Sequence, residues 1–232
     1  FYGRLYPEMQ PKGNDQEAFD LGRTTRAGSE RLFDFSFRLA RQRRAANPSK
    51  GRVTCVDKSN VLAGMAFLNK IFWERAKLNP DIVADHCYVD AVALNLIMRP
   101  WDYDVLPTEN QFGDILSDLA AGLIGGLGMS PSGDIGEKYG LFQPSHGSAP
   151  DIAGQGKANP TAMILSAAMM LEWLGEQHQL PEAGVEALRL RQAVDAAFAS
   201  GRVRSFELGG NDGTDAITAA ILASLAQRLA LA

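Results

Sequence analysis

The spacing of apolar residues divides the chain into short β-branched runs and longer stretches with helical periodicity. Runs of the first kind are typical of strands and stretches of the second kind are typical of helices. Strands are predicted over residues 52–56, 82–89, 103–106 and 139–142. Helices are predicted over residues 29–44, with Ser29 as the cap, and over 61–78, 90–98, 111–123, 160–174, 181–200 and 212–229. Because helices and strands alternate, the pattern predicts an α/β fold.

The remaining segments lack a steady period. Residues 1–24 are rich in glycine, proline and polar side chains, so we expect a loop or a short excursion from the globule. The glycine-rich segment 122–136 lacks the strand–turn–helix setting of a dinucleotide-binding motif, and we expect it to serve backbone packing or a helix end. A long loop is expected over residues 143–159.

The composition is that of a globular protein. Of the 232 residues, 46% are hydrophobic and 22% are charged, which excludes a disordered or fibrous chain. The formal net charge of −4 argues against a nucleic-acid partner. The apolar stretch Thr161–Leu171 stops at Glu172 and is too short to cross a bilayer, so no membrane partner is expected. Cys55 and Cys87 lie in strand-like surroundings, and with no visible signal peptide we expect reduced core cysteines in a cytoplasmic protein.

Two acidic residues on a predicted helix are candidates for a metal site. Asp114 and Asp118 in FGDILSD are spaced i,i+4, which places their carboxylates on one face. Such oxygen ligands suit Mg²⁺ or Mn²⁺, which is held by one or two carboxylates together with substrate oxygens and water. The alternative is that Asp114 lies in the first turn, where the helix dipole stabilises it, and that Asp118 faces solvent.

Polar residues that follow two predicted strands form a second candidate site. Lys58 lies just past the first strand, beside Asp57 and ahead of Asn60. Ligands of α/β sheets bind beyond the carboxyl ends of strands, and a lysine in a partly dry cleft can exchange protons near neutral pH. Asp90 follows the next strand. The alternatives are an exposed lysine with Ser59 or Asn60 as a helix cap, and Asp90 as the N-cap of its own helix.

The loop HGSAPDIAGQGKANP is a candidate nucleotide site. Its small residues, among them Gly147, Gly154 and Gly156, would let the backbone approach a ligand closely. The Asp151 carboxylate could accept hydrogen bonds from the two hydroxyl groups of an adenosine ribose and would repel a 2′-phosphate. The loop does not have the GxGxxG pattern.

Several segments, taken together and in this order, resemble one known family. VDKSNVL, YVDA, TENQFGDILSDLAAGLIGGLGMSPSGDIG and HGSAPDIAGQGKANPTAMILSAAMMLEWLG resemble the β-decarboxylating dehydrogenases, which act on 3-isopropylmalate, isocitrate, homoisocitrate, tartrate or D-malate. The likeness runs from about Phe1 to Gly175 and is weaker in LGGNDGTDAITAAIL. It implies a two-domain α/β subunit that is not a classical Rossmann fold.

The resemblance also implies a division of the chain. Residues 1–125 would form the central dimerisation and catalytic domain, and residues 126–232 would form the C-terminal part of the cofactor-binding domain. The N-terminal part of that domain would be absent, because relatives carry a long portion that would precede Phe1. We therefore expect that the active protein is longer than this sequence.

The resemblance further implies a set of site residues. Asp114 and Asp118 match metal-binding acids, and Lys58 and Asp90 match the catalytic lysine and third metal acid that come from the other subunit of a homodimer. Tyr2 matches a catalytic tyrosine. The residues that match cofactor contacts are Asn60, His146, Gly147, Ser148, Ala149, Asp151, Ile152 and Asn159.

The activity that follows from the resemblance is the metal-dependent, NAD-linked oxidative decarboxylation of a 3-substituted malate, with 3-isopropylmalate as the first candidate. NAD is favoured because Asp151 stands where NADP-linked isocitrate enzymes carry a lysine. Tartrate, D-malate and homoisocitrate remain alternative substrates. A catalytically incomplete fragment that only dimerises remains an alternative to an enzyme, as does an acidic metal-binding protein without redox chemistry.

Overall fold

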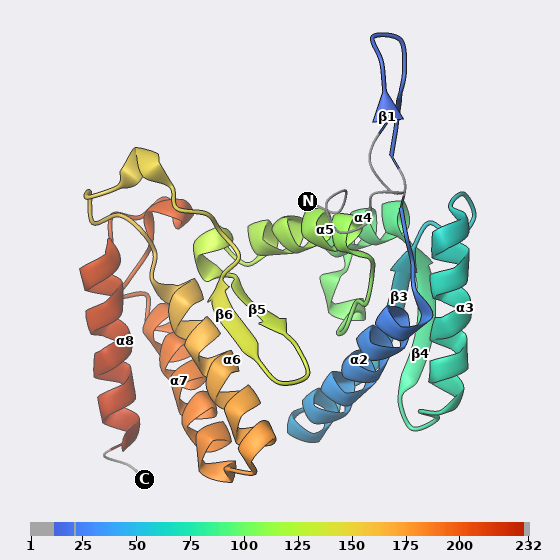
Figure 1. The fold of residues 1–232 in the computed structure, drawn as a ribbon. Helices are drawn as coiled ribbons and strands as arrows, with labels where there is room; N and C mark the ends of the chain where they lie inside the picture. Colours follow the sequence, from blue (N-terminus) through green and yellow to red (C-terminus); the bar gives the residue numbers. More distant parts are fainter. Residues whose placement is uncertain (1–11, 21, 230–232) are drawn as a thin grey trace. The chain divides into compact units, whose positions relative to one another are not determined.

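The computed structural model describes residues 12–20 and 22–229 of the chain. The chain forms two compact units, which divide between Leu116 and Ser117 inside helix α5 (Asn110–Leu123). Each unit has its own strands (Figure 1). Each also has its own hydrophobic core. The predicted α/β class is confirmed, and the roles expected for residues 1–125 and 126–232 stay predictions.

The first unit is organised around a parallel pair of strands. β3 (Arg52–Asp57) pairs with β4 (Val83–Tyr88), and helix α3 (Ala63–Lys77) connects them. Parallel strands need such a crossover, because a tight turn would make the next strand antiparallel. β3 is buried from Val53 to Asp57, which explains why its sequence is a continuous apolar run and not an alternation.

A third segment bonds to β3 without forming a regular strand. The Thr54 N–H donates to the carbonyl of Val105, and the Val105 N–H donates to the carbonyl of Arg52. The Val56 N–H donates in the same way to the carbonyl of Pro107. The strand predicted over 103–106 is therefore present only as one parallel bridge between Val53 and Val105.

Helix α2 (Arg26–Ala46) packs on β3 and on α3 and begins earlier than predicted. Its N-cap is Thr25, whose hydroxyl accepts a hydrogen bond from the Gly28 N–H at 3.3 Å. Ser29, the predicted cap, lies inside the helix, is buried and donates to the Thr25 carbonyl at 2.8 Å. The helix ends at Ala46, two residues beyond the predicted range, and Asn47 is its C-cap.

Aromatic side chains dominate the core between α2 and α3. The Phe72 ring lies 5.3 Å from Phe33 in an edge-on arrangement and 5.9 Å from Phe37 in a stacked one. All three side chains are fully buried. The core continues through these other buried residues: Ala40, Val53, Cys55, Met65, Leu68, Ile71, Ile82 and Val105.

The first unit continues from β4 into two helical segments. Helix α4 (Val89–Met98) follows the strand directly, and the short helix η2 (Pro100–Asp102) leads to the bridge at Val105. Both α4 and α5 were predicted within a residue or two of their observed bounds. An additional antiparallel hairpin, β1 (Lys12–Gly13) and β2 (Ala18–Phe19), lies where a loop or excursion was expected.

The second unit places a hairpin against three helices. β5 (Pro131–Ile135) and β6 (Gly140–Pro144) are antiparallel and pack on helix α6. α6 packs on α7, and α7 packs on α8 (Figure 1). The remaining bounds of the unit are α6 Thr161–His178, α7 Pro181–Ala199, α8 Thr214–Leu229, and the short helices η3 Leu127–Met129, η4 Pro150–Ile152 and η5 Phe206–Leu208.

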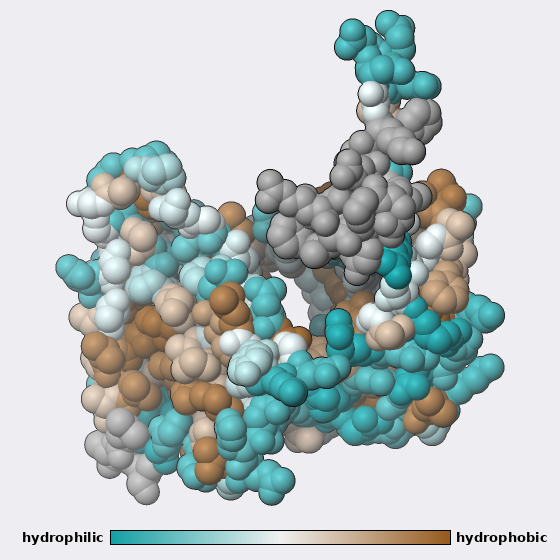
Figure 2. All heavy atoms as spheres, viewed as in Figure 1, coloured by the Kyte–Doolittle hydropathy of each residue, from teal (hydrophilic) through white to brown (hydrophobic). Residues whose placement is uncertain are grey.

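Apolar side chains also reach the surface of the second unit. Figure 2 shows hydrophobic residues gathered over α7 and α8, where Val185, Leu188 and Leu222 are exposed.

Within residues 12–20 and 22–229, no helix combines the length and the apolar character that crossing a bilayer requires.

Both cysteines are free thiols, as predicted. Cys55 is fully buried in the core of the first unit, and Cys87 is half-buried. Burial, aided by the neighbouring Asp57 carboxylate, raises the pKa of the Cys55 thiol well above its usual range. Cys55 therefore stays protonated at neutral pH and acts as a small apolar core residue.

Candidate active site

The chain turns sharply where β3 ends, and Lys58 lies in this turn. The N–H groups of Val61 and Leu62 both donate to the Lys58 carbonyl at 3.0 Å. Helix α3 then begins with Leu62 as its N-cap and has no side-chain cap. The alternative in which Ser59 or Asn60 caps this helix is therefore wrong.

The Lys58 side chain contacts Asp90, which lies just after the neighbouring strand β4. Lys58 Nζ donates to Asp90 Oδ1 at 2.7 Å, and this hydrogen bond holds the pKa of Asp90 below its usual value. The Lys58 ammonium also lies 5.9 Å from the centre of the Tyr88 ring. Asp90 lies in the first turn of α4, whose N-cap is Tyr88, so Asp90 is not the cap. The structure brings together two of the predicted site residues.

The residue directly before Lys58 is a buried acid that the sequence analysis did not single out. Asp57 is fully buried at the end of β3, and its carboxylate accepts hydrogen bonds from the turn, from α3 and from β4. Burial alone would raise the pKa of Asp57, but the hydrogen bond from His86 and those from Ser59 and Asn69 outweigh it and keep the pKa low. An acid at the end of an apolar strand was the available signal in the sequence.

The predicted metal acids lie one turn apart on α5. Asp114 and Asp118 are both exposed. The first turn of α5 contains no acidic residue, so Asp114 is not placed there for the helix dipole. Within the residues that the structure describes, no group of three or more His, Cys, Asp or Glu side chains could hold a metal ion. Two carboxylates suit an ion such as Mg²⁺, which keeps water and substrate oxygens among its ligands.

The predicted nucleotide loop surrounds a cavity of about 220 Å³ in the second unit. Most of its walls are small residues, which leave the backbone accessible. The lining residues are His146, Gly147, Ser148, Ala149, Ile152, Ala153, Gly154, Gly156, Ala158 and Thr214. Five of these are predicted cofactor contacts.

The loop keeps its shape through contacts to the start of helix α8. The Thr214 N–H donates to the Gly156 carbonyl at 2.8 Å, and the Thr214 hydroxyl donates to the Ala158 carbonyl at 2.6 Å. A Cβ atom at Gly213 would lie 2.0 Å from the Gly156 oxygen, so only glycine fits there. A Cβ atom at Gly147 would meet nothing within 4 Å. Ala149 adopts a left-handed conformation with φ of 43°.

The other predicted cofactor contacts lie in different surroundings. Asn159 does not line the cavity; it is buried, donates to Glu207 at 3.1 Å and accepts from the Thr161 hydroxyl at 2.6 Å. Asp151 is exposed on η4, and Asn60 is exposed in the turn after β3. Tyr2 lies outside the described residues.

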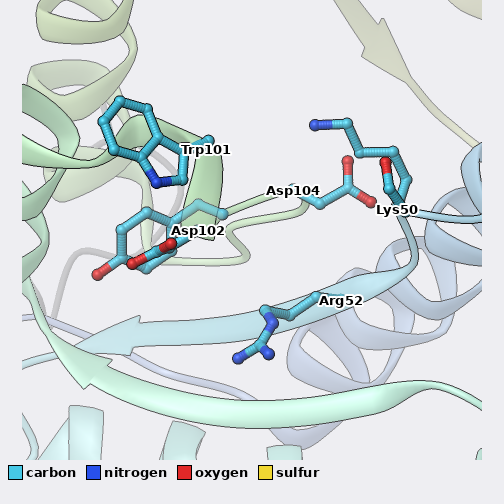
Figure 3. A pocket seen from close by; sticks show the side chains of 7 residues that line it. Lys50, Arg52, Trp101, Asp102 and Asp104 are labelled. Atoms are coloured by element: carbon cyan, nitrogen blue, oxygen red, sulfur yellow. The ribbon is translucent and has the colours of Figure 1, made fainter.

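A larger hollow of about 450 Å³ lies at the opposite, amino-terminal end of β3 (Figure 3). None of the predicted site residues lines it. Its lining residues are Ser49, Lys50, Arg52, Trp101, Asp102, Tyr103 and Asp104. Three of the charged groups have ion-pair partners: Arg52 with Asp85, Asp102 with Arg99, and Asp104 with Arg43. These pairs account for the charges of Arg52, Asp102 and Asp104 without a ligand.

Comparison with known proteins identifies the family of this site. The family model described as isocitrate/isopropylmalate dehydrogenase matches residues 2–221. The chain belongs to the isocitrate/isopropylmalate dehydrogenase family. The resemblance inferred from the QFGDILSD and HGSAPDIAG segments is therefore confirmed.

Individual members of the isocitrate/isopropylmalate dehydrogenase family are similar along most of the chain. The 3-isopropylmalate/3-methylmalate dehydrogenase of Methanocaldococcus jannaschii is 46% identical over 188 residues, which are 81% of this chain and 54% of the relative. The isocitrate/homoisocitrate dehydrogenase of Thermus thermophilus is 44% identical over 224 residues, which are 95% of this chain and 62% of the relative. The chain thus spans only part of the length of these family members.

Solved structures of the family share the fold. A crystal structure of isocitrate dehydrogenase from Methylococcus capsulatus has a TM-score of 0.81 at 42% identity, covering 93% of this chain and 62% of that one. A β-decarboxylating dehydrogenase from Thermococcus kodakarensis also has a TM-score of 0.81, at 34% identity, covering 95% of this chain and 61% of that one. The predicted isopropylmalate-dehydrogenase-like fold is confirmed.

Proposed function

We propose that the protein catalyses the NAD-linked oxidative decarboxylation of a 3-substituted malate with Mg²⁺ or Mn²⁺, and that 3-isopropylmalate is its substrate. The observation that carries this proposal is the contact between Lys58 and Asp90 at 2.7 Å, at the carboxyl ends of two parallel strands. This contact supports the proposal because it pairs the lysine proposed as the base with a carboxylate, the type of group that binds divalent ions. The names of the relatives support this class of reaction.

Two sets of residues would hold the cofactors. Asp114 and Asp118, with Asp90 from a second subunit, would bind the divalent ion, and the cavity in the 146–158 loop would take the adenosine of NAD. Bound NAD⁺ would accept hydride from the substrate's carbinol carbon, while the divalent ion would act as a Lewis acid toward the substrate's oxygens. Asp151 would bond the ribose hydroxyls.

The protein's own residues would move two protons. Lys58, in its neutral form and through a water molecule, would take the hydroxyl proton as the carbinol carbon is oxidised. The resulting 3-carboxy-2-keto acid loses CO₂ when its carbon–carbon bond breaks, and the electron pair of that bond remains as an enolate. Tyr2 would then protonate the enolate carbon as a general acid.

Exposed apolar side chains support the homodimer in this proposal. Helices α4 and α5 carry Asp90 and Asp114, and both also expose large apolar side chains to solvent. Exposed apolar patches of this kind are typical of protein–protein interfaces. The exposed side chains are Leu94, Ile97 and Met98 on α4, with exposed fractions of 62%, 59% and 66%, and Ile115 on α5 with 60%. A second copy of the chain would cover them and bring Lys58 and Asp90 to the acids of its partner.

A substrate panel tests the proposed function. The complete protein, with Mn²⁺ and NAD⁺, is expected to form NADH with 3-isopropylmalate faster than with D-malate, tartrate or homoisocitrate, and EDTA should abolish the signal. A faster rate with one of the other acids would replace 3-isopropylmalate as the substrate. No NADH with any of them would favour the inert dimerising fragment.

Replacing Asp151 by lysine should shift the cofactor preference. A hydrogen bond to a charged group contributes about 1.5–3 kcal/mol, so the ratio of kcat/KM for NAD over NADP should fall roughly 10- to 100-fold. Steady-state kinetics with both cofactors measures this ratio. Asp134→Lys, an exposed acid on β5, is the matched control and should leave the ratio unchanged. Equal ratios in both variants would contradict the ribose role of Asp151.

A further inference from the structure

The Asp57 carboxylate links three elements around the base of Lys58. Oδ1 accepts from the Ser59 N–H at 2.8 Å and from His86 Nε2 at 2.9 Å, and Oδ2 accepts from Asn69 Nδ2 at 2.9 Å. Ser59 belongs to the turn, Asn69 to α3 and His86 to β4. One side chain therefore fixes the turn against both a helix and a strand.

Burying a carboxylate at the end of a strand costs free energy. An ionised group without water needs full hydrogen bonding, and an apolar residue of similar volume would often serve the fold as well. Asp57 nevertheless has three nitrogen donors, and the low pKa keeps it ionised. Because an ionised carboxylate only accepts, His86 must carry its proton on Nε2. All three donors therefore point toward the carboxylate of Asp57, the residue that precedes Lys58.

His86 connects this cluster to the other end of the Lys58 side chain. Its ring meets the Tyr88 ring edge-on, with centres 5.0 Å apart and planes at 87°. The Tyr88 ring in turn lies 5.9 Å from Lys58 Nζ. The backbone of Lys58 is therefore held through Asp57 and its ammonium is placed beside Tyr88, and His86 contacts both supports.

We infer that Asp57, Asn69 and His86 are positioning residues that hold Lys58 where it takes the substrate's proton. This inference rests on the proposed dehydrogenase function. None of the three needs to touch the substrate, because each acts through the turn or through Tyr88. A misplacement of a catalytic group by about 1 Å can lower the rate about 100-fold, so such support has a large effect.

Two substitutions of His86 test the inference by their contrast. In the complete protein, His86→Phe keeps a ring beside Tyr88 but removes the donor to Asp57, and kcat should fall about 10- to 100-fold. The affinity for AMP, which would occupy only the 146–158 loop, should not change, since that loop belongs to the other unit. His86→Gln restores an N–H donor and should recover most of kcat. His178→Phe, at the exposed end of α6, is the matched control and should not change kcat.

A second measurement follows Lys58 without any turnover. Lysines dimethylated with ¹³C-formaldehyde give methyl signals in NMR, and Lys58→Arg identifies the one from Lys58. The Tyr88 ring should change the chemical shift of the Lys58 methyl signal in the parent and in His86→Gln. This displacement should be absent in His86→Phe. Equal kcat and equal Lys58 signals in the parent and His86→Phe would overturn the inference.

The positioning role of His86 can also be tested if the parent is inactive or if His86→Phe does not fold. If the parent forms no NADH with any malate, the proposed function fails, and the Lys58 signal alone decides the positioning role. If circular dichroism shows that His86→Phe does not fold, Asn69→Leu replaces it, because this half-buried position loses one donor at similar volume. A lost displacement in that variant supports the inference, and an unchanged Lys58 signal overturns it.

Discussion

Replacing Lys58 by alanine should lower kcat of the complete protein by about 10²- to 10⁴-fold, the usual contribution of a general base. The fold should survive, because the partner carboxylate of Asp90 is largely exposed, at 68%, and stays hydrated when the amine is removed. Initial rates of NADH formation with the preferred malate measure the effect. Thermal unfolding of the same sample should match the parent.

Two companions separate the proton-transfer role from a charge effect. Lys58→Arg keeps the positive charge near Asp90 but cannot give up a proton near neutral pH, so it should be as slow as the alanine variant. Lys77→Ala removes an exposed lysine at the end of α3 and should leave kcat unchanged. Full activity in Lys58→Ala would remove this residue from the mechanism.

Replacing Phe72 by alanine should destabilise the protein by about 3–5 kcal/mol, as truncation of a buried phenylalanine does. The Phe72 ring is fully buried and lies between 5.1 and 5.9 Å from the rings of Trp73, Phe33 and Phe37, so the loss includes these aromatic contacts. The midpoint and slope of a urea unfolding curve measure the change. The first unit should lose its stability before the second, because Phe72 belongs to the core of the first unit alone.

The matched control for this change lies on the same helix. Phe67 is also on α3, but it is 36% exposed and contacts the Arg26 guanidinium at 5.7 Å from its ring centre. An exposed contact of this kind contributes about 0.5–1 kcal/mol, so Phe67→Ala should be mild. An equal loss of stability in the two variants would contradict the central place of Phe72 in the core.

The helices and parallel strands could be predicted because their apolar residues are patterned locally. Strand β5 was missed for the opposite reason. Its residues include Pro131, Ser132 and Gly133, which disfavour strands, and pairing with β6 and packing on α6 hold it in place. At Gly133 a Cβ atom would lie only 3.1 Å from the Phe142 ring, so tertiary packing favours the residue that weakens the local signal.

The candidate site could be predicted only in part. Residue spacing and the family resemblance pointed to Lys58, Asp90 and the nucleotide loop, and the structure shows the contact of Lys58 with Asp90 and a cavity in that loop. Neither pattern revealed Asp57, because its donors come from positions up to 29 residues away in sequence. Asn159 is assigned to the cofactor pocket by resemblance; its side chain bonds to Glu207 and Thr161, and its contact with a cofactor stays a prediction.

The glycines around the proposed nucleotide cavity are not interchangeable, which gives a protein engineer a defined starting point. Position 213 is closed to any side chain by the neighbouring carbonyl, and positions 154 and 156 are restricted by left-handed backbone angles of 73° and 65°. Position 147 is open and carries no such restriction. A library of variants designed to bind a synthetic cofactor should therefore vary residue 147 first and keep residues 154, 156 and 213 unchanged.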